Sequence, residues 1–531
     1  MTRSIKTHSG QQAPQPPDQS EVIALLSSAS TYGPDGDEVQ RIETHGALVF
    51  LTGSRAYKLK RAVKLPYMDF STLEKRAAAC RHELERNRPA APDIYIGVLP
   101  VMRRKTGELA LGGEGVAVDW VVVMNQFEQA DLFDALACRG QLPMSQMPLL
   151  ATQIADYHDA AKTFRAVDGS RTMADVISQV VTSFFEAGDS VGLDRAQLYA
   201  RQIVAALNAH SDLLRTRSHS GCVRLCHGDL HLRNIVLHDG HPTLFDAIEF
   251  DDRMATIDVL YDLAFLLMDL WHRGLKEHAN LCFGNYISRA VSTGELNGLS
   301  ALPLFLSVRA AVRAMVAIDK VAVTAGTDRK LALKEIDEYL ALALELLQPR
   351  PPSLIAIGGL SGTGKTTVSA GLAPNLGRPP GALHLRSDVE RKRLAGVDPL
   401  VRLPREAYSS SASDKVYKNL CERAERALKA GQAVVVDAVF DQAAHRRRIE
   451  QVATRARVPF FGAWLVAPQE TLVDRVSNRK NDASDADASV VMMQVARKTT
   501  VTCWETVDAG GDKGDARLRI ESAMREKLAR A

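Results

Sequence analysis

The chain has 531 residues, too long for one hydrophobic core, and this length predicts roughly two to four domains. Apolar residues make up 46% and charged residues 24%, the balance of a soluble globular protein. The formal net charge of +3 is small for this length, so charge favours neither nucleic acid nor an anionic membrane as a partner. No apolar run approaches the length that spans a bilayer, and we expect a cytoplasmic protein.

The N-terminal segment and the cysteines fit this interpretation. Residues 1–19 are rich in Gln, Pro and Ser, lack the apolar centre of a secretory signal, and are expected to be disordered. The seven Cys are scattered, and only Cys222 and Cys226 lie close in sequence. No second pair or suitable His spacing completes a metal site, so we expect buried, reduced thiols.

A small β-rich lobe is predicted at about 20–124. Residues 46–51 (GALVFL) and 56–60 (AYKLK) are typical of antiparallel strands joined by a turn at GSR. The other elements expected in this lobe are a helix at about 71–88 and strands at 94–101 and 116–124.

The pattern from about 125 to 347 is mostly helical and predicts a larger lobe. Its last helical stretch, 331–347, runs into QPRPPS at 348–353, where closely spaced prolines end the helix and predict a linker. Strands and helices alternate from 354 to 531, with strands expected at LIAIGG, HLRSD, AVVVDA and FFGAWLV. This alternation predicts an α/β domain whose parallel sheet is covered on both faces.

The stretch CHGDLHLRNIVLHDGHPTLFDAIEF, residues 226–250, places His, Asp and Asn around two short apolar runs. Two strands joined by the turn at DGHP bring their ends together, so Asn234 and Asp246 could converge on one cation. Two oxygen ligands with room for phosphate oxygens suit Mg²⁺. Asp229 would lie beside the metal, where it could orient an acceptor hydroxyl and take its proton.

Other interpretations of this stretch are weaker. His227 and His231 have a spacing possible for one helix face, but no third ligand converges with them, and Asp and Asn suit a harder ion than zinc. A Ser-His-Asp hydrolase would need a nucleophile elbow, which the stretch lacks. Phosphoryl transfer is therefore favoured over zinc binding, hydrolysis and a merely buried polar loop.

HGDLHLRN followed by LFDAIEF resembles the catalytic loop and metal-binding segment of the aminoglycoside phosphotransferase-like kinases, relatives of the protein kinases. The resemblance implies an α+β bilobal kinase-like fold for residues 20–347. It implies that Asp229 is the catalytic base and that Asn234 and Asp246 bind magnesium. His227 would brace the loop, and Asp262 in the following helix would support it rather than react.

The same resemblance implies a lysine for the nucleotide phosphates and an acid that holds this lysine. Lys58 and Lys60 point to the same side of their strand. Lys58 matches the kinase strand pattern better, and Lys60 stays a competitor. Glu83 is the preferred acid over Glu74 and Glu85, with surface helix charge as the alternative for all three.

Three further features bear on this half. Residues 121–127 resemble the interlobe hinge that contacts adenine. No GxGxxG motif is present to cover the phosphates, so their cover is expected to be looser or to come from other loops. Arg309 and Arg313 lie one helical turn apart and could face an anionic acceptor, although a solvated helix face is the favoured interpretation.

Residues 359–366, GLSGTGKT, match the pattern GxxxxGK[ST] and follow an apolar strand. Backbone N–H groups of such a turn and of the following helix cradle phosphate oxygens. Lys365 would reach the β- and γ-phosphates, and the Thr366 hydroxyl would bind Mg²⁺. The predicted nucleotide-binding residues of this loop are Gly359, Leu360, Ser361, Gly362, Thr363, Gly364, Lys365, Thr366 and Thr367.

Four more residues complete the predicted second site. Asp437 ends an apolar strand, where the Walker B acid lies near Mg²⁺. Asp388 follows another strand and could be the base for an acceptor hydroxyl or the N-cap of the next helix. Arg475 and Arg479 share a helix face before a polar loop, which looks like the lid of small P-loop kinases whose arginines contact the transferring phosphate. No NKxD motif is present, which favours ATP over GTP.

This half resembles the small-molecule P-loop kinases, a group similar to gluconate kinase, chloramphenicol phosphotransferase and zeta-toxin-like enzymes. Together the halves resemble bacterial bifunctional proteins that join an aminoglycoside phosphotransferase-like domain to a P-loop ATP-binding domain, here 354–531. The resemblance implies two kinase sites that use ATP and Mg²⁺ and act on hydroxyls of small molecules, not on nucleic acid or membranes. In the alternative, one half is an ATP-responsive module that regulates the other. The acceptors and the oligomeric state stay open.

Overall fold

A computed structural model describes residues 18–33, 38–44, 46–65, 68–289, 294–479, 482–497, 499, 501, 503–511 and 513–528. The predicted disordered segment, 1–19, lies outside these residues except for Asp18 and Gln19. The chain divides into two compact units, and each is described by itself. The first contains the chain up to Gly140 together with 227–229 and 233–255, and the second contains the remaining residues.

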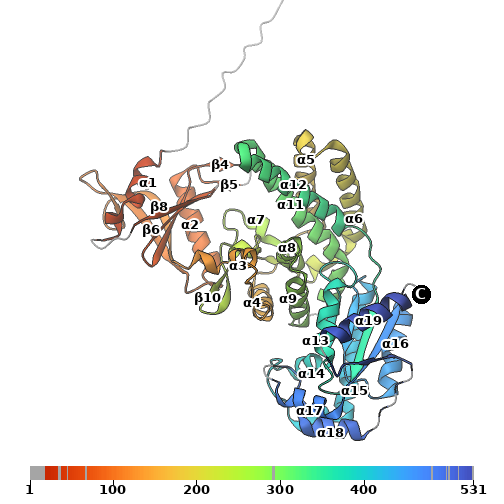
Figure 1. The fold of residues 1–531 in the computed structure, drawn as a ribbon. Coiled ribbons are helices and arrows are strands. Elements are labelled where there is room, and N and C mark those ends of the chain that lie inside the picture. The colour runs from red at the N-terminus through yellow and green to blue at the C-terminus, as the bar shows by residue number, and fades with distance from the viewer. Residues whose placement is uncertain are drawn as a thin grey trace, which may run out of the picture. The chain divides into compact units, whose positions relative to one another are not determined.

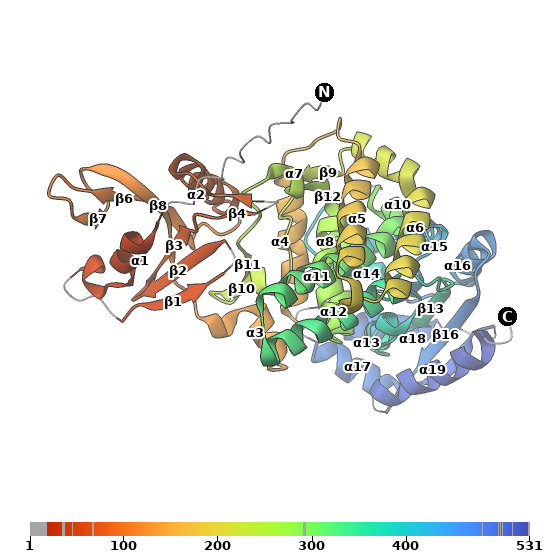
Figure 2. The same cartoon turned by 90° about the horizontal axis from the view of Figure 1, so that it is seen from above.

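A six-stranded antiparallel sheet forms the centre of the first unit, in the order β1-β2-β3-β8-β6-β7. It is the red-to-orange part of Figure 1, and its strands are labelled in Figure 2. All four predicted strands of this lobe are present. The sheet consists of β1 Gln40–Glu43, β2 Ala47–Thr52, β3 Arg55–Lys60, β6 Tyr95–Arg103, β7 Leu109–Leu111 and β8 Val116–Asn125. The other elements of this unit are α1 Ser20–Ser27, β4 Lys64–Leu65, β5 Met68–Asp69, α2 Leu73–Asn87, α3 Phe133–Cys138, β10 Ile235–His238, β11 His241–Leu244 and α7 Asp252–Ala255.

Strand β8 is buried on both faces, and this explains its continuous apolar run. Val122 and Met124 pack in one apolar layer with Cys80 of α2, while Val121 and Val123 pack in a second layer with α1. Helix α2 confirms the helix expected at about 71–88, and it packs against β3, β6 and β8. The sheet and α2 together form the frame on which the first candidate site is built.

Helix α11 packs against α5, α8 and α12 in the helical part of the second unit (Figure 2). This part confirms the mostly helical pattern predicted before the linker. It contains α4 Gln146–Ala160, α5 Gly169–Glu186, α6 Leu193–His219, β9 Val223–Leu225, β12 Thr256–Asp258, α8 Val259–His272, α9 Lys276–Arg289, α10 Gly294–Gly298, α11 Leu302–Val323 and α12 Gly326–Leu346.

Two expectations about this helical part are wrong. Arg309 is buried, with its guanidinium over the rings of Tyr261 at 3.9 Å and Phe265 at 4.6 Å, so it does not lie on a solvated face. Segment Leu296–Val323 is long and apolar enough to cross a bilayer, although no such run was expected. Of its most apolar window, 67% is buried inside the protein, as is usual for a core helix.

The cysteines follow the expectation only in part. All seven are free thiols, and five of them are buried. Cys138 and Cys503 are exposed, so burial does not hold for every thiol.

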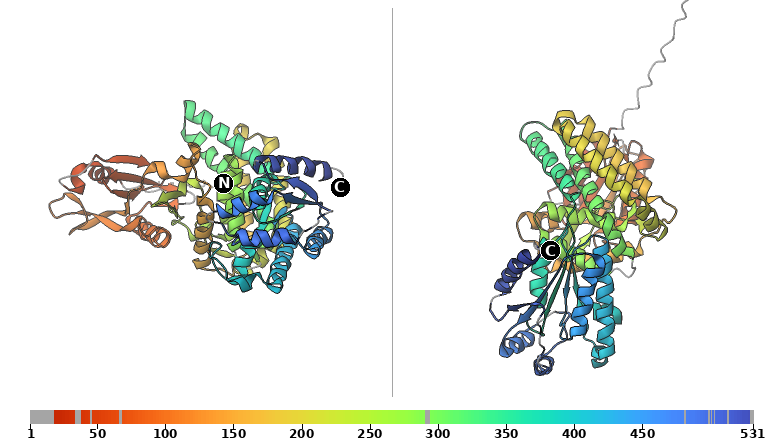
Figure 3. Two further views of the ribbon diagram at one scale, coloured as in Figure 1. Left: turned by 60° about the horizontal axis from the view of Figure 1, so that its bottom comes forward. Right: turned by 90° about the vertical axis from the view of Figure 1, so that its right-hand side faces the viewer.

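A five-stranded parallel sheet follows the linker, in the order β14-β15-β13-β16-β17. Helices α13 and α19 pack together on one face, and α15 and α16 pack together on the other, which confirms the predicted two-sided cover (Figure 3). Strand β17 was not predicted, because ETVD carries no apolar run. The elements are β13 Leu354–Gly359, α13 Lys365–Leu372, β14 Leu383–Arg386, α14 Ser387–Ala395, α15 Ser410–Lys429, β15 Val434–Asp437, α16 Ala443–Ala456, β16 Phe460–Val466, α17 Gln469–Ser477, α18 Ala488–Ala496, β17 Glu505–Asp508 and α19 Lys513–Leu528.

Candidate active sites

The hairpin β10–β11 brings the two ends of the first candidate site together. Ile235 pairs with Leu244, and the Phe245 N–H donates to the Asn234 carbonyl at 3.1 Å. The Asn234 side-chain N–H₂ donates to the Asp229 carbonyl and to its carboxylate, both at 2.9 Å. This arrangement leaves the Asn234 amide oxygen as an acceptor next to the Asp229 carboxylate.

Asp246 follows the hairpin in a left-handed backbone conformation, with φ of 60°. Its carboxylate accepts from Lys58 Nζ at 2.6 Å, and Lys58 also donates to Glu83 Oε1 at 2.8 Å. Burial by itself would lower the pKa of the Lys58 ammonium, but the charges of Asp246 and Glu83 hold this pKa well above its usual value. Lys58 is therefore a permanently charged group between the helix acid and the predicted metal ligand.

Glu83 contacts both candidate lysines. Its carboxylate is fully buried and reaches Lys58 with one oxygen and Lys60 with the other. Burial opposes ionisation, yet the two ammonium groups lower the pKa of Glu83 to about 2. Glu74 and Glu85, the other candidate acids, are exposed. The geometry therefore favours Glu83 over both, and it gives Lys60 a different second partner, Glu249.

The loop that carries Asp229 is held by its neighbours. His227 Nε2 forms a hydrogen bond with the Phe245 carbonyl at 2.9 Å, and the Ile248 N–H donates to the His227 carbonyl at 3.0 Å. Gly228 has φ of 85°, and a Cβ there would meet Ile248 Cδ1 at 2.9 Å. A glycine is thus required at this turn, and His227 braces the loop in the way the resemblance implied.

Asp262 has a buried histidine partner in the second unit. Its carboxylate lies 3.1 Å from His158 Nε2, and the other ring nitrogen bonds Tyr286 Oη at 2.9 Å. The ligand atoms of His158, Asp262 and Cys226 lie within 4.8 Å of one another, and all three residues are buried. Asp262 therefore lies beside Cys226, the first residue of the stretch 226–250, and its role in supporting the catalytic loop stays a prediction.

The second candidate site is built on the loop between β13 and α13. A Cβ at Gly359 would meet the Leu465 carbonyl oxygen at 2.8 Å, and one at Gly362 would meet the Leu472 carbonyl oxygen at 2.6 Å. Lys365 Nζ donates to the Leu360 carbonyl at 2.9 Å. The loop thus packs so closely on its surroundings that only glycine fits at two of its positions.

Asp437 ends β15 beside this loop. The Thr366 hydroxyl donates to its carboxylate at 2.5 Å, and His384 Nε2 lies 3.6 Å away. Burial would raise the pKa of Asp437, but the nearby His384, followed by the charge of Lys365, lowers it to about 2. Asp437 is therefore ionised at every pH at which the protein would be assayed.

Both sites offer the donors that magnesium prefers. Asp246 and Asn234 provide carboxylate and amide oxygens in the first, and Thr366 and Asp437 provide hydroxyl and carboxylate oxygens in the second. These are hard oxygen ligands, which suit Mg²⁺ better than zinc or copper. The residues therefore fit a nucleotide-bound magnesium ion at each site.

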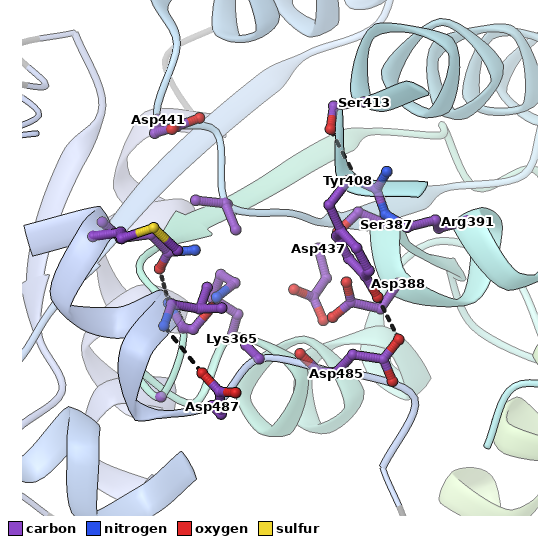
Figure 4. A pocket seen from close by; sticks show the side chains of 18 of the residues that line it. Lys365, Ser387, Asp388, Arg391, Tyr408, Ser413, Asp437, Asp441, Asp485 and Asp487 are labelled. Carbon is purple, nitrogen blue, oxygen red and sulfur yellow. Dashed lines mark hydrogen bonds between the residues drawn. The ribbon is translucent and has the colours of Figure 1, made fainter. Parts of the chain in front are cut away.

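A cavity of about 1790 Å³ opens over Lys365 and Asp437, and Asp388 lines its wall (Figure 4). Asp388 lies in the first turn of α14, whose N-cap position is Arg386, so Asp388 is not the N-cap of this helix. Burial raises the pKa of Asp388, while the charge of Arg386 opposes this rise. A half-buried carboxyl group with a raised pKa at the cavity wall suits a general base.

The two candidate lid arginines differ in their partners. Arg479 lines the cavity, and its nearest acid is Asp482 at 3.8 Å. Arg475 also lines the cavity, but its guanidinium donates to the carbonyl oxygens of Ala509 at 2.8 Å and Gly511 at 3.0 Å. The predicted phosphate contact stays a prediction for both, and the geometry favours Arg479.

Asp485 joins two segments at the cavity wall, and no sequence motif indicated this contact. Its carboxylate accepts from the Leu403 N–H at 3.0 Å, from Lys392 Nζ at 2.8 Å and from the Tyr408 hydroxyl. The Lys392 side chain is almost fully buried, so Asp485 balances a charge that water does not reach.

The Asp485→Asn variant should lower the free energy of unfolding of the P-loop domain by about 2–4 kcal/mol, because it leaves the buried ammonium of Lys392 without its anion. Chemical denaturation followed by tryptophan fluorescence measures this change. Asp487→Asn is the matched control, since Asp487 is exposed, pairs with Arg402 at 3.4 Å and caps α18, a position where Asn serves equally well. Equal losses in both variants would contradict the proposed charge balance.

Sequence reasoning missed three further residues of the two sites. Gln494 of α18 accepts from the Ser361 N–H of the glycine-rich loop at 2.8 Å, and His384 contacts Asp437 from the neighbouring strand. Neither belongs to a sequence motif used in the prediction. Glu249, three residues after Asp246, could have been found from the acid spacing in DAIEF.

Each half of the chain thus carries a lysine, carboxylates near it and a set of oxygen atoms that suit magnesium, and two family matches identify the protein as a phosphotransferase. Residues 140–286 match the family described as the phosphotransferase enzyme family, and residues 354–500 match the family described as an AAA domain. The predicted fusion of an aminoglycoside phosphotransferase-like, α+β kinase-like domain with a parallel-sheet P-loop domain is confirmed by these two matches and by the two sheets.

The chain is also similar over most of its length to curated proteins. It is 26% identical over 479 residues to uncharacterized proteins of Mycobacterium tuberculosis and Mycobacterium bovis, covering 89% of this chain and 92% of theirs. A choline/ethanolamine kinase family protein from Mesorhizobium loti is 14% identical, with a TM-score of 0.39 over 62% of this chain and 98% of that one. A gluconokinase from Sinorhizobium meliloti is 17% identical, with a TM-score of 0.26 over 34% of this chain and 96% of that one.

Proposed function

We propose that this protein is a tandem kinase with two ATP- and Mg²⁺-dependent sites, each of which transfers the γ-phosphoryl group of ATP to a hydroxyl of a small molecule. The observation that carries the proposal is that the parts of both sites occur as hydrogen-bonded sets. Lys58, Glu83 and Asp246 form one set, and Thr366 and Asp437 belong to the other. A pure binding protein would need no base, whereas acids at the expected positions of a base are present in both halves.

In the first site, Asp229 would accept the proton of the acceptor hydroxyl as the hydroxyl oxygen attacks the γ-phosphorus. Lys58, held by Glu83, would bind the nucleotide phosphates, and magnesium bound by Asn234 and Asp246 would neutralise phosphate charge. The donation from Asn234 to the Asp229 carboxylate keeps this acid oriented.

In the second site, backbone N–H groups of the loop 359–366 and the Lys365 ammonium would hold the β- and γ-phosphates. Thr366 and Asp437 would hold magnesium, which supplies charge neutralisation when bound. Asp388 would take the acceptor proton, and Arg479 would stabilise charge on the transferring group.

The decisive experiment is transfer of label from γ-labelled ATP to metabolites of a cell extract by the purified chain. It should be run on the wild type, on Asp229→Asn, on Lys365→Ala and on the double variant. We expect each single variant to lose a different set of labelled products and the double variant to lose both sets. Full labelling by the double variant would sink the proposal.

A second candidate function is regulation of one half by the other, and one observation favours it. The turn between β2 and β3 spans only Gly53 and Ser54. This turn is short for a loop that covers phosphates in a kinase-like domain. Regulation would be preferred if only Lys365→Ala abolished labelling while Asp229→Asn or Lys58→Met changed the KM of the remaining activity.

The raised pKa of Asp388 predicts the pH dependence of the second site. A general base acts in its deprotonated form, so kcat/KM should fall toward acid pH, beginning above the usual range of an aspartate. Arg386→Gln should move this acid limb to higher pH, because the positive charge of Arg386 favours the ionised carboxylate. The pH profile with the labelled acceptor, in the Asp229→Asn background, measures both effects. An acid limb unmoved by Arg386→Gln would argue against Asp388 as the titrating base.

A further inference from the structure

Helix α2 holds the backbone of the metal-binding segment at three points in the first unit, one of them a hydrogen bond from Arg86 Nε to the Ile248 carbonyl at 3.3 Å. The Ala247 N–H donates to Asn87 Oδ1 at 2.7 Å, and His82 Nδ1 forms a hydrogen bond with the Glu249 carbonyl at 2.6 Å. Glu249 is therefore held against the same helix that carries Glu83. Its side chain is buried, with 8% of its surface exposed.

Lys60 lies between these two acids. Its ammonium contacts a carboxylate oxygen of Glu83 and one of Glu249, and it lies 5.5 Å from the centre of the Phe70 ring. Only 2% of the Lys60 side chain is exposed, so water does not screen its charge. The site thus contains a second buried lysine that competes with Lys58 for Glu83.

We propose that Glu249 is a positioning residue of the first site, which pairs with Lys60 and thereby leaves Glu83 to hold Lys58 toward the nucleotide phosphates. The inference rests on the proposed role of Lys58 in binding nucleotide. Without Glu249, the buried charge of Lys60 would have Glu83 as its nearest anion. Attraction between charges is strong where water is excluded, so Glu83 would be drawn from Lys58 toward Lys60.

The charge balance of the cluster supports this assignment. Lys58 and Lys60 contribute two positive charges, and Glu83 alone could balance one of them. Asp246 also contacts Lys58, but it is a predicted magnesium ligand and its side chain is 40% exposed. Glu249 is therefore the buried acid that satisfies Lys60 while Asp246 is engaged with the metal.

The test measures binding of MgATP by titration calorimetry to the full-length chain, in a Lys365→Ala background that silences the second site. Glu249→Gln should weaken first-site binding by about tenfold. The double variant Lys60→Met with Glu249→Gln should recover to within about threefold of the parent, because it removes the competing cation together with its partner. Glu85→Gln is the matched control. Glu85 lies on α2, the helix that carries Glu83, and its side chain is exposed, so this variant should leave binding unchanged.

The outcomes separate this inference from the proposed function. Unchanged binding in Lys58→Met would remove the proposed nucleotide role of Lys58 and the role of Glu249 with it. Weakened binding in Lys58→Met with unchanged binding in Glu249→Gln would overturn only the role of Glu249. The role of Glu249 would also be overturned if the double variant Lys60→Met with Glu249→Gln bound MgATP as weakly as Glu249→Gln alone. Circular dichroism checks folding, and if neither Glu249 variant folds, the pair is a folding element and the proposal is overturned.

Discussion

The Asp229→Asn variant is expected to lose first-site phosphoryl transfer by about 10²–10⁴-fold, the range typical of removing a general base. The substitution keeps the size of the side chain and an acceptor for the N–H₂ group of Asn234, so the loop should keep its conformation. Binding of MgATP should therefore change little, because Asp229 is assigned to the acceptor proton and not to the nucleotide.

The measurement is the rate of label transfer to the first-site product in a Lys365→Ala background, together with calorimetric binding of MgATP. Asp239→Asn is the matched control. Asp239 lies in the turn of the same hairpin, its side chain is 89% exposed, and Asn tolerates its left-handed backbone, with φ of 48°. A loss of nucleotide binding equal to the loss of rate would contradict the assignment of Asp229 as base, since it would indicate a damaged nucleotide site.

Replacement of Lys365 by Ala should abolish second-site transfer, with a loss of at least about 10²-fold in rate, because it removes the ammonium that is proposed to bind the transferring phosphoryl group. The apo protein should not be destabilised by the same change. Burial lowers the pKa of the Lys365 ammonium despite the nearby charges of Asp437 and Asp388, so this cation is held at an energetic cost in the folded state.

Thermal unfolding with and without MgATP separates the two effects. The variant should keep the apo Tm of the P-loop domain and lose the increase that bound nucleotide gives the wild type. Lys418→Met on α15 is the control, because Lys418 is exposed and pairs only loosely with Glu422, at 3.9 Å. A lowered apo Tm in Lys365→Ala with a normal nucleotide response would show that Lys365 is a structural residue.

Where chemistry depends on a short continuous segment, the sequence predicted it well. The loop 359–366 needs a glycine at Gly359, because a Cβ there would lie only 2.8 Å from the Leu465 carbonyl oxygen. The motif GxxxxGK[ST] specifies a glycine at this position, so the sequence alone predicts it. The hairpin after Asn234 could also be predicted from the sequence, because two apolar runs joined by a turn place the start of the first strand beside the end of the second. The parallel sheet followed from the alternation of strands and helices.

Choices between equivalent neighbours needed the tertiary structure. Lys58 and Lys60 lie two residues apart on β3 and point to the same side, so strand periodicity does not distinguish them. Their contacts do, because Lys58 pairs with Asp246 and Lys60 pairs with Glu249. Arg309 is a similar case. Its charge predicted a solvated helix face, yet aromatic rings contributed by another helix enclose it, so its burial was decided by residues about 45 positions away.

Local segments of the sequence were enough to predict the phosphotransferase class of this protein and the residues of each motif, because backbone geometry and hydrogen bonding act within a few residues. The tertiary fold was needed to show which charges are buried and which groups balance them. Lys392 pairs with Asp485, Asp437 lies beside His384, and Lys60 pairs with Glu249. Electrostatic partners are selected by distance in space and by exclusion of water, and neither is recorded in the spacing of residues along the chain.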